Sequence, residues 1–349
     1  MLRFSSRIVS ALVLTWFAGS FAAQQRTPAD SRMWRDQSPH RVQFVEVADR
    51  VKLEVLDWGG TGRALILLAG SGNTAHVFDD LAPKLTDCCH VYAITRRGYG
   101  ASSQPRAGYD DQRLSDDVLK AIDVLHVRSP VLMGHSMAGG ELTTLGRQHS
   151  DRLAGLVYLD ALGDPRDWPA SDPAYVALLK NLPPAPSPPA ACAHDRASFT
   201  AFRASLRCRM GFAFPESELR NSFATNADGS VGSHKTPRFV HEAIGEGQAK
   251  RDYSNIRVPV LAFYEFARTS IDQLRPDDPQ PRNDEERRAL LAYALATKAF
   301  VDRWTANLKR SVPDARLIDL PAAGHYVFLT REAEILRELR AFISRLPPT

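Results

Sequence analysis

Two side chains with complementary chemistry, Ser136 and His325, lie in segments of the kind that hold a nucleophile and its base. Ser136 is the centre of the pentapeptide 134–138 (GHSMA), which follows a short apolar run at 130–133. A serine at the apex of a strand–turn–helix junction has a strained backbone and an exposed hydroxyl. The alternative is a serine that only caps the following helix. We interpret Ser136 as a nucleophile.

The residues on either side of Ser136 match this interpretation. Strand and helix backbones nearly touch at such a turn, so small residues are needed two positions before and after the serine. Gly134 and Ala138 supply them. The strict form of the pattern has glycine where Ala138 stands, and alanine is the mildest departure from it. Both residues are therefore predicted to have a structural role at this turn.

His325 lies in a loop of the kind that delivers a general base. The segment 321–328 (PAAGHYVF) follows the last predicted strand and precedes the last predicted helix. Such a loop brings its histidine to the same end of the sheet as Ser136, where it can accept the hydroxyl proton. The side chain of His135, although adjacent to Ser136, is expected to point away from the hydroxyl.

Strands and helices alternate along the chain and provide the frame for these residues. Alternating apolar residues predict a hairpin, and continuous apolar runs predict buried strands. The segments between these predicted strands have helical periodicity and are predicted to be helices. The alternation predicts an α/β fold with a mostly parallel, doubly wound sheet. The predicted strands are 42–47, 51–57, 64–69, 91–95, 130–133, 156–159, 258–264 and 315–320, and the predicted helices are 78–85, 114–125, 137–149, 284–311 and 332–346.

Residues 164–253 interrupt this rhythm. The interruption includes a proline-rich stretch at 182–189 and helical stretches such as 198–206. We interpret it as a helical cap inserted between two parts of the core, 38–163 and 254–349. The long helix near 284–311 is expected to support the cap.

Several segments resemble those of the α/β-hydrolase superfamily, with its helical-capped, esterase- or lipase-like serine hydrolases. They are 67–72 (LLAGSG), 97–102 (RGYGAS), 134–139 (GHSMAG), 156–161 (LVYLDA) and 324–325 (GH). The resemblance covers nearly the whole chain after its N-terminal segment. In that family the loop after the third strand usually reads His-Gly-X, and here Ala69 replaces the histidine.

The resemblance also implies an oxyanion hole. The backbone N–H of Ser71 corresponds to that of X, and the second N–H belongs to Met137, directly after the nucleophile. Two fixed donors of this kind stabilise a developing oxyanion by several kcal/mol. The alternative is that 70–72 forms only a tight turn.

The acid that orients His325 has more than one candidate. The family usually places an aspartate after the strand that is here 258–264, but this stretch continues with Glu265 and has no aspartate before Asp272. Some members carry the acid after the preceding strand, where this chain has Asp160. We favour Asp160 over Glu265, with Asp272 third. Such an acid fixes the histidine tautomer and stabilises the imidazolium.

A serine nucleophile points to a carboxylic ester, lactone, thioester or amide cleaved through an acyl-enzyme. Epoxide hydrolases and haloalkane dehalogenases of this fold attack through an aspartate instead. The predicted cap would cover Ser136 and shape the acyl pocket. Its aromatic residues either line that pocket or form a small core of the cap itself: Trp168, Phe199, Phe202, Phe212 and Phe214.

Two other functions remain open. An aminopeptidase or amidase resembling proline iminopeptidases would need acidic cap residues to hold a substrate ammonium. The available ones are Glu216, Glu218, Glu242 and Glu246, most of which we expect to be solvated. A non-catalytic binding protein on a degenerate hydrolase scaffold would explain the missing aspartate after 258–264.

Composition narrows the classes of function. The chain has 349 residues, 44% hydrophobic and 24% charged, and a net charge of +4 without a basic block. Nucleic-acid binding is not expected, because it usually requires a clustered basic stripe. No Cys/His spacing indicates a metal site, and no motif implies a cofactor. The expected partner is a small-molecule ester or amide, and the sequence does not indicate an oligomeric state.

The N-terminus predicts export. Arg3 and Arg7 precede an apolar run at 8–18 and the small-residue segment 19–23, as in a secretory signal peptide (1–23) with cleavage after residue 22 or 23. The apolar run is too short to span a bilayer. We therefore expect a periplasmic or secreted protein with no stable membrane span after cleavage.

Four cysteines are an even number, as expected in an oxidising compartment. Cys192 and Cys208 are the favoured pair, because both lie in the predicted cap. Cys88 and Cys89 are adjacent, and a disulfide between neighbours is strained. A bridge from one of them to the cap is the alternative.

Overall fold

A computed structural model describes residues 34–187, 189–265, 270, 274 and 278–347. The chain forms two units, 1–38 and 39–349, and residues 34–38 of the first contain no helix or strand. The fold described below is that of the second unit. The predicted signal peptide (1–23) and Asp272 lie outside the described residues.

One eight-stranded sheet forms the centre of the second unit, in the order β1-β2-β4-β3-β5-β6-β9-β10. The antiparallel pairs are β1 with β2 and β2 with β4, and the remaining pairs are parallel. The predicted α/β fold class is confirmed. The strands are β1 (Arg41–Ala48), β2 (Val51–Gly59), β3 (Arg63–Leu68), β4 (Cys89–Ile94), β5 (Val131–His135), β6 (Gly155–Leu159), β9 (Val260–Tyr264) and β10 (Arg316–Asp319).

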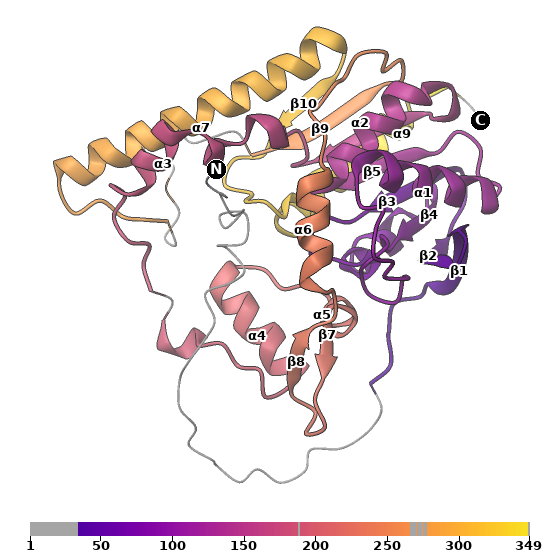
Figure 1. The fold of residues 1–349 in the computed structure, drawn as a ribbon, viewed down its shortest axis with the longest axis horizontal. Coiled ribbons are helices and arrows are strands. Elements are labelled where there is room, and N and C mark those ends of the chain that lie inside the picture. Colours follow the sequence, from indigo (N-terminus) through magenta and orange to yellow (C-terminus); the bar gives the residue numbers. More distant parts are fainter. Residues whose placement is uncertain (1–33, 188, 266–269, 271–273, 275–277, 348–349) are drawn as a thin grey trace. The chain divides into compact units, whose positions relative to one another are not determined.

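The central strands β5, β6 and β9 are buried along their whole length. Their sequences are continuous apolar runs, because helices cover both faces of the sheet (Figure 1). The carboxyl ends of these parallel strands therefore meet at one edge, where loops can bring polar side chains together.

The helices divide between the two faces. One hydrophobic cluster includes residues of α1 (Asp111–Val124), α2 (Gly139–Gln148) and α7 (Asp284–Ser311). The cluster on the opposite face includes residues of α9 (Glu332–Ile343) and of the turns η1 and η2. A four-residue helix, α8 (Val327–Thr330), precedes α9.

The helix predicted at 78–85 is instead two 3-10 turns, η1 (Ala75–Phe78) and η2 (Ala82–Leu85). The reason is Pro83, which has no backbone N–H and clashes with the preceding turn of an α-helix. A short 3-10 turn, η3 (Ser136–Ala138), likewise precedes α2, so the helix predicted from residue 137 begins at Gly139.

Residues 164–253 are hereafter called the cap segment, and the part of it that the structure describes contains four helices and a hairpin. The helices are α3 (Pro173–Leu179), α4 (Phe199–Met210), α5 (Glu216–Ser222) and α6 (Arg238–Gly247). The hairpin of β7 (Phe223–Thr225) and β8 (Val231–His234) was not expected from the sequence, which predicted helices alone. Three 3-10 turns complete the segment: η5 (Pro165–Asp167), η6 (Pro169–Ser171) and η7 (Ala190–Cys192).

Part of the cap segment has a small core of its own. Phe199, Phe202, Leu219 and Val231 pack together there. The predicted disulfide between Cys192 and Cys208 is confirmed, with Cα atoms 5.4 Å apart. Cys88 and Cys89 are free thiols.

Helix α7 supports the cap segment as expected. Trp168 stacks on Trp304 with ring centroids 5.5 Å apart, and Tyr175 of α3 packs edge-on against Phe300. Among the residues that the structure describes, no helix combines the length and the apolar character that crossing a membrane would need.

Candidate active site

Ser136 lies at the turn between β5 and α2, as the sequence predicts. Its φ of 55° is in the left-handed region, which is unusual for a residue other than glycine. A side chain at Gly134 would place Cβ 2.6 Å from Leu142 Cδ1 and 2.9 Å from Ala138 Cβ. The turn therefore needs the small residues that flank it.

The loop between β10 and α8 brings His325 to Ser136. Nε2 of His325 lies 2.8 Å from Ser136 Oγ. Nδ1 of the same ring lies 2.6 Å from Asp160 Oδ2. With Asp160 ionised, Nδ1–H donates to the carboxylate, and Nε2 is left to accept the serine hydroxyl proton.

Asp160 directly follows β6 and has a φ of 46°. Its backbone N–H donates to the carbonyl of Phe263 in the neighbouring strand, 2.8 Å away. This bond fixes the backbone of a residue in an uncommon conformation, so the carboxylate is held toward His325. Gly139 shows how closely α2 approaches the same turn, since a Cβ there would lie 2.0 Å from the carbonyl oxygen of Ala161.

Glu265, the competing acid, occupies a different position. Its carboxylate accepts a hydrogen bond from the backbone N–H of Gly324, next to His325 in the chain. Glu265 thus holds the loop that carries His325. The structure brings Ser136, His325 and Asp160 together and places Glu265 at the backbone of the loop.

The side chains of His325 and Asp160 differ in exposure. The side chain of His325 is 50% exposed, whereas that of Asp160 is 14% exposed. Burial and the nearby Asp160 carboxylate also raise the pKa of Tyr264 well above its usual value. A small molecule could therefore reach the imidazole while the carboxylate remains shielded.

The loop after β3 lies against the Ser136 turn. A Cβ on Gly70 would be 2.6 Å from His135 Nδ1 and 3.1 Å from Ser136 Cβ. Ser71 follows at the exposed tip of this loop. Met137, the other predicted donor, lies in the first turn of η3, where backbone N–H groups lack intrahelical acceptors. The two predicted donors thus belong to segments in contact with each other.

His135 packs behind the catalytic candidates. Its Nε2 lies 2.9 Å from the carbonyl oxygen of His325, so Nε2 carries the proton and donates. Burial, followed by the positive charge that His325 can carry, lowers the pKa of His135 well below its usual value. A neutral His135 therefore supports the backbone of the His325 loop, and its Nδ1 is buried without a hydrogen-bond partner among the described residues.

The cap aromatics divide between the two roles left open by the sequence. Phe199 and Phe202 belong to the small core of the cap segment, and Trp168 stacks against α7. Phe212 and Phe214 pack against Tyr326, with ring centroids 5.3 and 4.9 Å away. Because Tyr326 follows His325, these two phenylalanines are the cap aromatics placed near the candidate site.

The four cap glutamates are not equivalent. Glu216 pairs with Arg220 and Glu242 with Arg238, each on its own helix, and Glu246 is exposed. Glu218 is the one of the four that is buried, with only 1% of its surface exposed. The residues around Glu218 in the sequence do not indicate that it is buried. Its burial arises from contacts with residues about 145 positions earlier.

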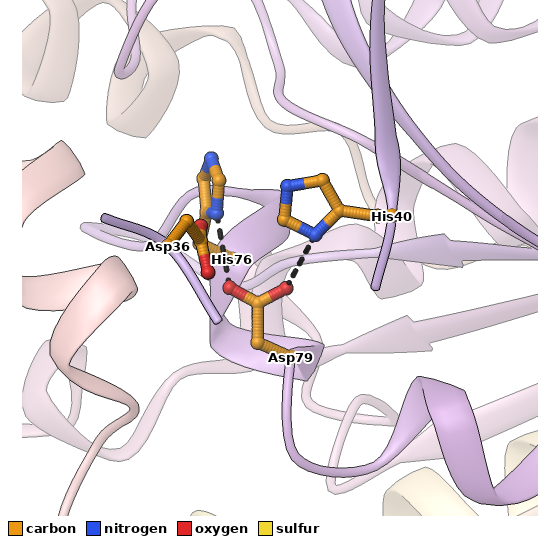
Figure 2. A group of neighbouring side chains, drawn as sticks. All are labelled: Asp36, His40, His76 and Asp79. Atoms are coloured by element: carbon orange, nitrogen blue, oxygen red, sulfur yellow. Dashed lines mark hydrogen bonds and ion pairs between the residues drawn. The ribbon is translucent and has the colours of Figure 1, made fainter. Parts of the chain in front are cut away.

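One group of side chains offers donors of the kind that zinc binds. Figure 2 shows Nδ1 of His40 and Nδ1 of His76 on the two oxygens of Asp79, each at 3.0 Å. Burial raises the pKa of Asp79, but these hydrogen bonds outweigh it and hold the pKa at about 2. Each oxygen of the Asp79 carboxylate is thus already hydrogen-bonded to one imidazole. We assign these contacts a structural role.

Residues 65–338 match the alpha/beta hydrolase family, which is more than half of the chain. The chain belongs to this family. Solved structures of hydrolases have the same fold. The structure of E-2-(acetamidomethylene)succinate hydrolase covers 87% of this chain and 99% of its own, with a TM-score of 0.62 and 18% identity. A marine microorganism esterase covers 84% and 99%, with a TM-score of 0.55 and 19% identity.

Curated relatives of this hydrolase match over shorter stretches. The 2-(acetamidomethylene)succinate hydrolase of Mesorhizobium japonicum is 28% identical over 111 residues, 32% of this chain and 40% of that protein. Epoxide hydrolase A of Mycobacterium tuberculosis is 32% identical over 120 residues, 33% of this chain and 37% of that protein. The chain thus spans about two-fifths of the length of these relatives.

Proposed function

We propose that this α/β-hydrolase cleaves a carboxylic ester, or a lactone or thioester, through an acyl-enzyme. The observation that carries the proposal is the hydrogen-bonded series Ser136–His325–Asp160, with contacts of 2.8 and 2.6 Å. A serine, a histidine and a carboxylate in this order are the parts of a nucleophile activated by an oriented base.

In the proposed reaction, Ser136 Oγ attacks the carbonyl carbon while Nε2 of His325 takes the hydroxyl proton. The tetrahedral intermediate collapses with cleavage of the bond to the leaving group, which receives that proton from His325. Water then attacks the acyl-enzyme, again giving a proton to His325. Collapse of the second intermediate releases the acid and returns the proton to Ser136. Asp160 holds His325 in the required tautomer and stabilises its imidazolium form. The proposed reaction needs no cofactor.

The oxyanion of each intermediate is assigned to the N–H groups of Ser71 and Met137. The close approach of Gly70 to Ser136 supports this assignment. Because η3 leads directly into α2, the positive N-terminal end of the α2 dipole lies close to the Met137 N–H. Removal of one such donor typically costs about 100- to 1000-fold in kcat.

The cap glutamates favour an ester over an amino-terminal peptide as substrate. Glu216 and Glu242 pair with arginines of their own helices, and Glu218 accepts hydrogen bonds within the protein. At these three of the four glutamates, a substrate ammonium would have to displace the existing partners. The binding-scaffold alternative is weakened by Asp160, which takes the place of the missing acid. Export to the periplasm or medium remains a proposal based on residues 1–23, and the intact mass of the mature protein tests it.

Steady-state hydrolysis tests the proposed function. We expect turnover of p-nitrophenyl acetate and butyrate, with kcat/KM far above that for alanine or proline p-nitroanilide. Turnover should be lost in Ser136→Ala and His325→Ala. Preference for the anilides would move the aminopeptidase to first place, and equal ester turnover in wild type and Ser136→Ala would refute the proposed nucleophile.

A further inference from the structure

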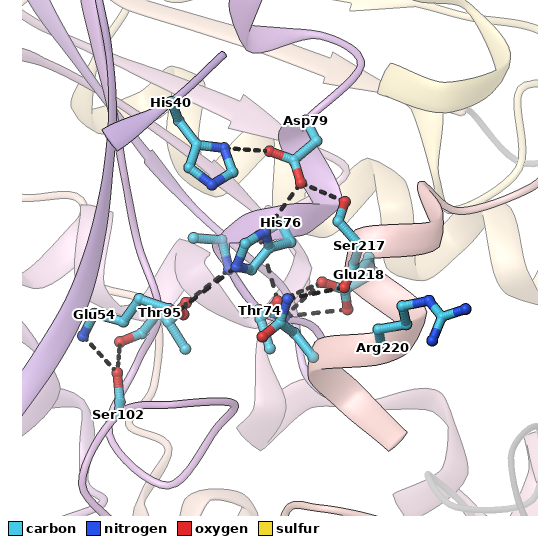
Figure 3. A network of polar contacts seen from close by, with 12 residues as sticks. His40, Glu54, Thr74, His76, Asp79, Thr95, Ser102, Ser217, Glu218 and Arg220 are labelled. Atoms are coloured by element: carbon cyan, nitrogen blue, oxygen red, sulfur yellow. Dashed lines mark hydrogen bonds and ion pairs between the residues drawn. The ribbon is translucent and has the colours of Figure 1, made fainter. Parts of the chain in front are cut away.

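Helix α5 of the cap segment carries a carboxylate into the core of the protein. The side chain of Glu218 accepts hydrogen bonds from Asn73 Nδ2 at 2.9 Å, from Thr74 Oγ1 at 2.5 Å and from the backbone N–H of Thr74 at 3.2 Å. Ser222, one turn later on α5, donates at 2.9 Å. Figure 3 shows Glu218 of α5 beside Thr74 of the core.

The partners of Glu218 belong to the segment that forms the candidate oxyanion hole. Residues 70–74, hereafter the oxyanion loop, contain both Asn73 and Thr74, and Ser71 lies two positions before Asn73. The amide of Asn73 has a second role. Its Oδ1 accepts a hydrogen bond from the hydroxyl of Tyr326, 3.0 Å away, and Tyr326 directly follows His325.

Asn73 therefore bridges two functional segments. Its amide nitrogen donates to the cap, and its amide oxygen accepts from the segment that carries the base. This polarity leaves one orientation of the amide compatible with both contacts, since Glu218 supplies only acceptors and the Tyr326 hydroxyl has its proton to donate.

The contacts of Glu218 identify its carboxyl group as a fixed hydrogen-bond acceptor. Burial raises the pKa of Glu218, and the hydrogen bonds from Thr74, Asn73 and Ser222 offset only part of that rise. All of these contacts come from donors, as a carboxylate requires. Charge-assisted bonds are stronger than neutral ones, and losing an acceptor at a buried site leaves donors unsatisfied.

A neighbouring residue holds α5 at a second point. The hydroxyl of Ser217 donates to Asp79. The same carboxylate is hydrogen-bonded to His40 and His76 (Figure 3). The opposite nitrogen of His76 lies 3.6 Å from Glu54 on β2. Because consecutive residues of α5 are tied to the core, the helix cannot rotate without breaking buried polar contacts.

We propose that Glu218 is a positioning residue, by which the cap fixes the oxyanion loop and, through Asn73 and Tyr326, the segment of His325. The inference rests on the proposed function and adds to it a dependence of the chemical step on the cap. A small displacement is sufficient for a large effect, since a misplacement of about 1 Å can cost about 100-fold in rate.

The test uses three variants of the full chain and a matched control. Glu218→Gln replaces one acceptor oxygen by a donor, and Tyr326→Phe removes only the hydroxyl that contacts Asn73. The third variant combines them. Glu216→Gln makes the same chemical change two residues earlier on α5, where the carboxylate pairs with Arg220 and not with the oxyanion loop. The measurements are kcat and KM for p-nitrophenyl butyrate, the rate of labelling by a fluorophosphonate, and the melting temperature.

We expect each single variant to lower kcat and the labelling rate by about 10- to 100-fold, with KM changed less than about threefold and the control near wild type. The two losses should not multiply in the double variant, because both changes act through Asn73. Full activity in Tyr326→Phe would overturn the inference even if Glu218→Gln fails to fold. Independent, multiplying losses would also overturn it.

Wild-type labelling separates this inference from the proposed function. Wild-type labelling at Ser136 together with unchanged rates in both single variants refutes the positioning role alone. Absence of wild-type labelling refutes the nucleophile, and with it the positioning role that depends on it.

Discussion

At the residue scale, the candidate site is built on two non-glycine residues in the left-handed region. Ser136 has a φ of 55° and Asp160 a φ of 46°. Such conformations cost about 1–3 kcal/mol each and persist only where the surroundings enforce them. Here the enforcing contacts are the close packing at Gly134 and the backbone bond from Asp160 to β9. Backbone strain thus coincides with a proposed catalytic role at both positions.

The first prediction separates the two acids. Asp160→Asn keeps the shape of the side chain but removes the charge that orients His325, so kcat should fall by about 1000- to 10,000-fold. Glu265→Gln removes an acceptor for the Gly324 N–H and should reduce kcat far less. Steady-state assays of the two folded variants decide the matter. Near-normal activity in Asp160→Asn, with loss in Glu265→Gln, would reverse our assignment.

The second prediction concerns pH and His135. Its pKa is lower in the folded state than in the unfolded chain, so below about pH 6.5 the unfolded chain binds a proton that the folded protein does not. Stability contributed by neutral His135 is complete above this pH and is lost as the pH falls, by up to about 1.4 kcal/mol per pH unit. Other histidines also contribute to the change of unfolding free energy with pH. The contribution of His135 is therefore measured by comparison with a variant.

Denaturant unfolding at several pH values gives the comparison. The free energy of unfolding of wild type should fall more steeply between pH 6.5 and 5 than that of His135→Gln. Parallel curves for the two proteins would contradict the assignment of His135 as a buried neutral donor.

At the element scale, sequence patterns predicted those features that depend on local spacing. Helix α7 was predicted at 284–311 and occupies Asp284–Ser311, because its periodicity extends over many turns. The turn at Ser136 was predicted from five consecutive residues. The β7–β8 hairpin was missed, since its strands are short and its turn, with Gly229 at a φ of 82°, lies among polar residues.

Contacts distant in the sequence could not be predicted in the same way. Asp160 and Glu265 both end strands at the same edge of the sheet, and the loop that ends at His325 decides which carboxylate faces the ring. Burial of Glu218 likewise depends on a loop about 145 residues away. Neither fact has a signature in local composition.

The third prediction tests the disulfide of the cap segment. Cys192 and Cys208 are 16 positions apart, and closing a loop of this length stabilises a protein by about 3 kcal/mol. The double variant Cys192→Ser, Cys208→Ser should lower the free energy of unfolding by about this amount. Cys88→Ser is the control, because Cys88 is a free thiol. Equal stability of the double variant and wild type would show that the bridge adds nothing to the fold.

At the scale of the whole molecule, the sheet and the cap segment have different parts in the account. The parallel strands bring Ser136, Asp160 and His325 to one edge from positions up to 189 residues apart. The cap segment approaches that edge with Phe212, Phe214 and Glu218. Family membership and fold are shared with other hydrolases, and the cap contacts add to this frame near the candidate site.

The central claim is that Ser136 is an activated nucleophile, and covalent labelling tests it most directly. The protein is treated with a fluorophosphonate probe beside Ser136→Ala, and the modified peptide is identified by mass spectrometry. The account predicts one adduct on Ser136 that is absent from the variant. A well-folded wild-type protein that remains unlabelled, or labels at another residue, would contradict it.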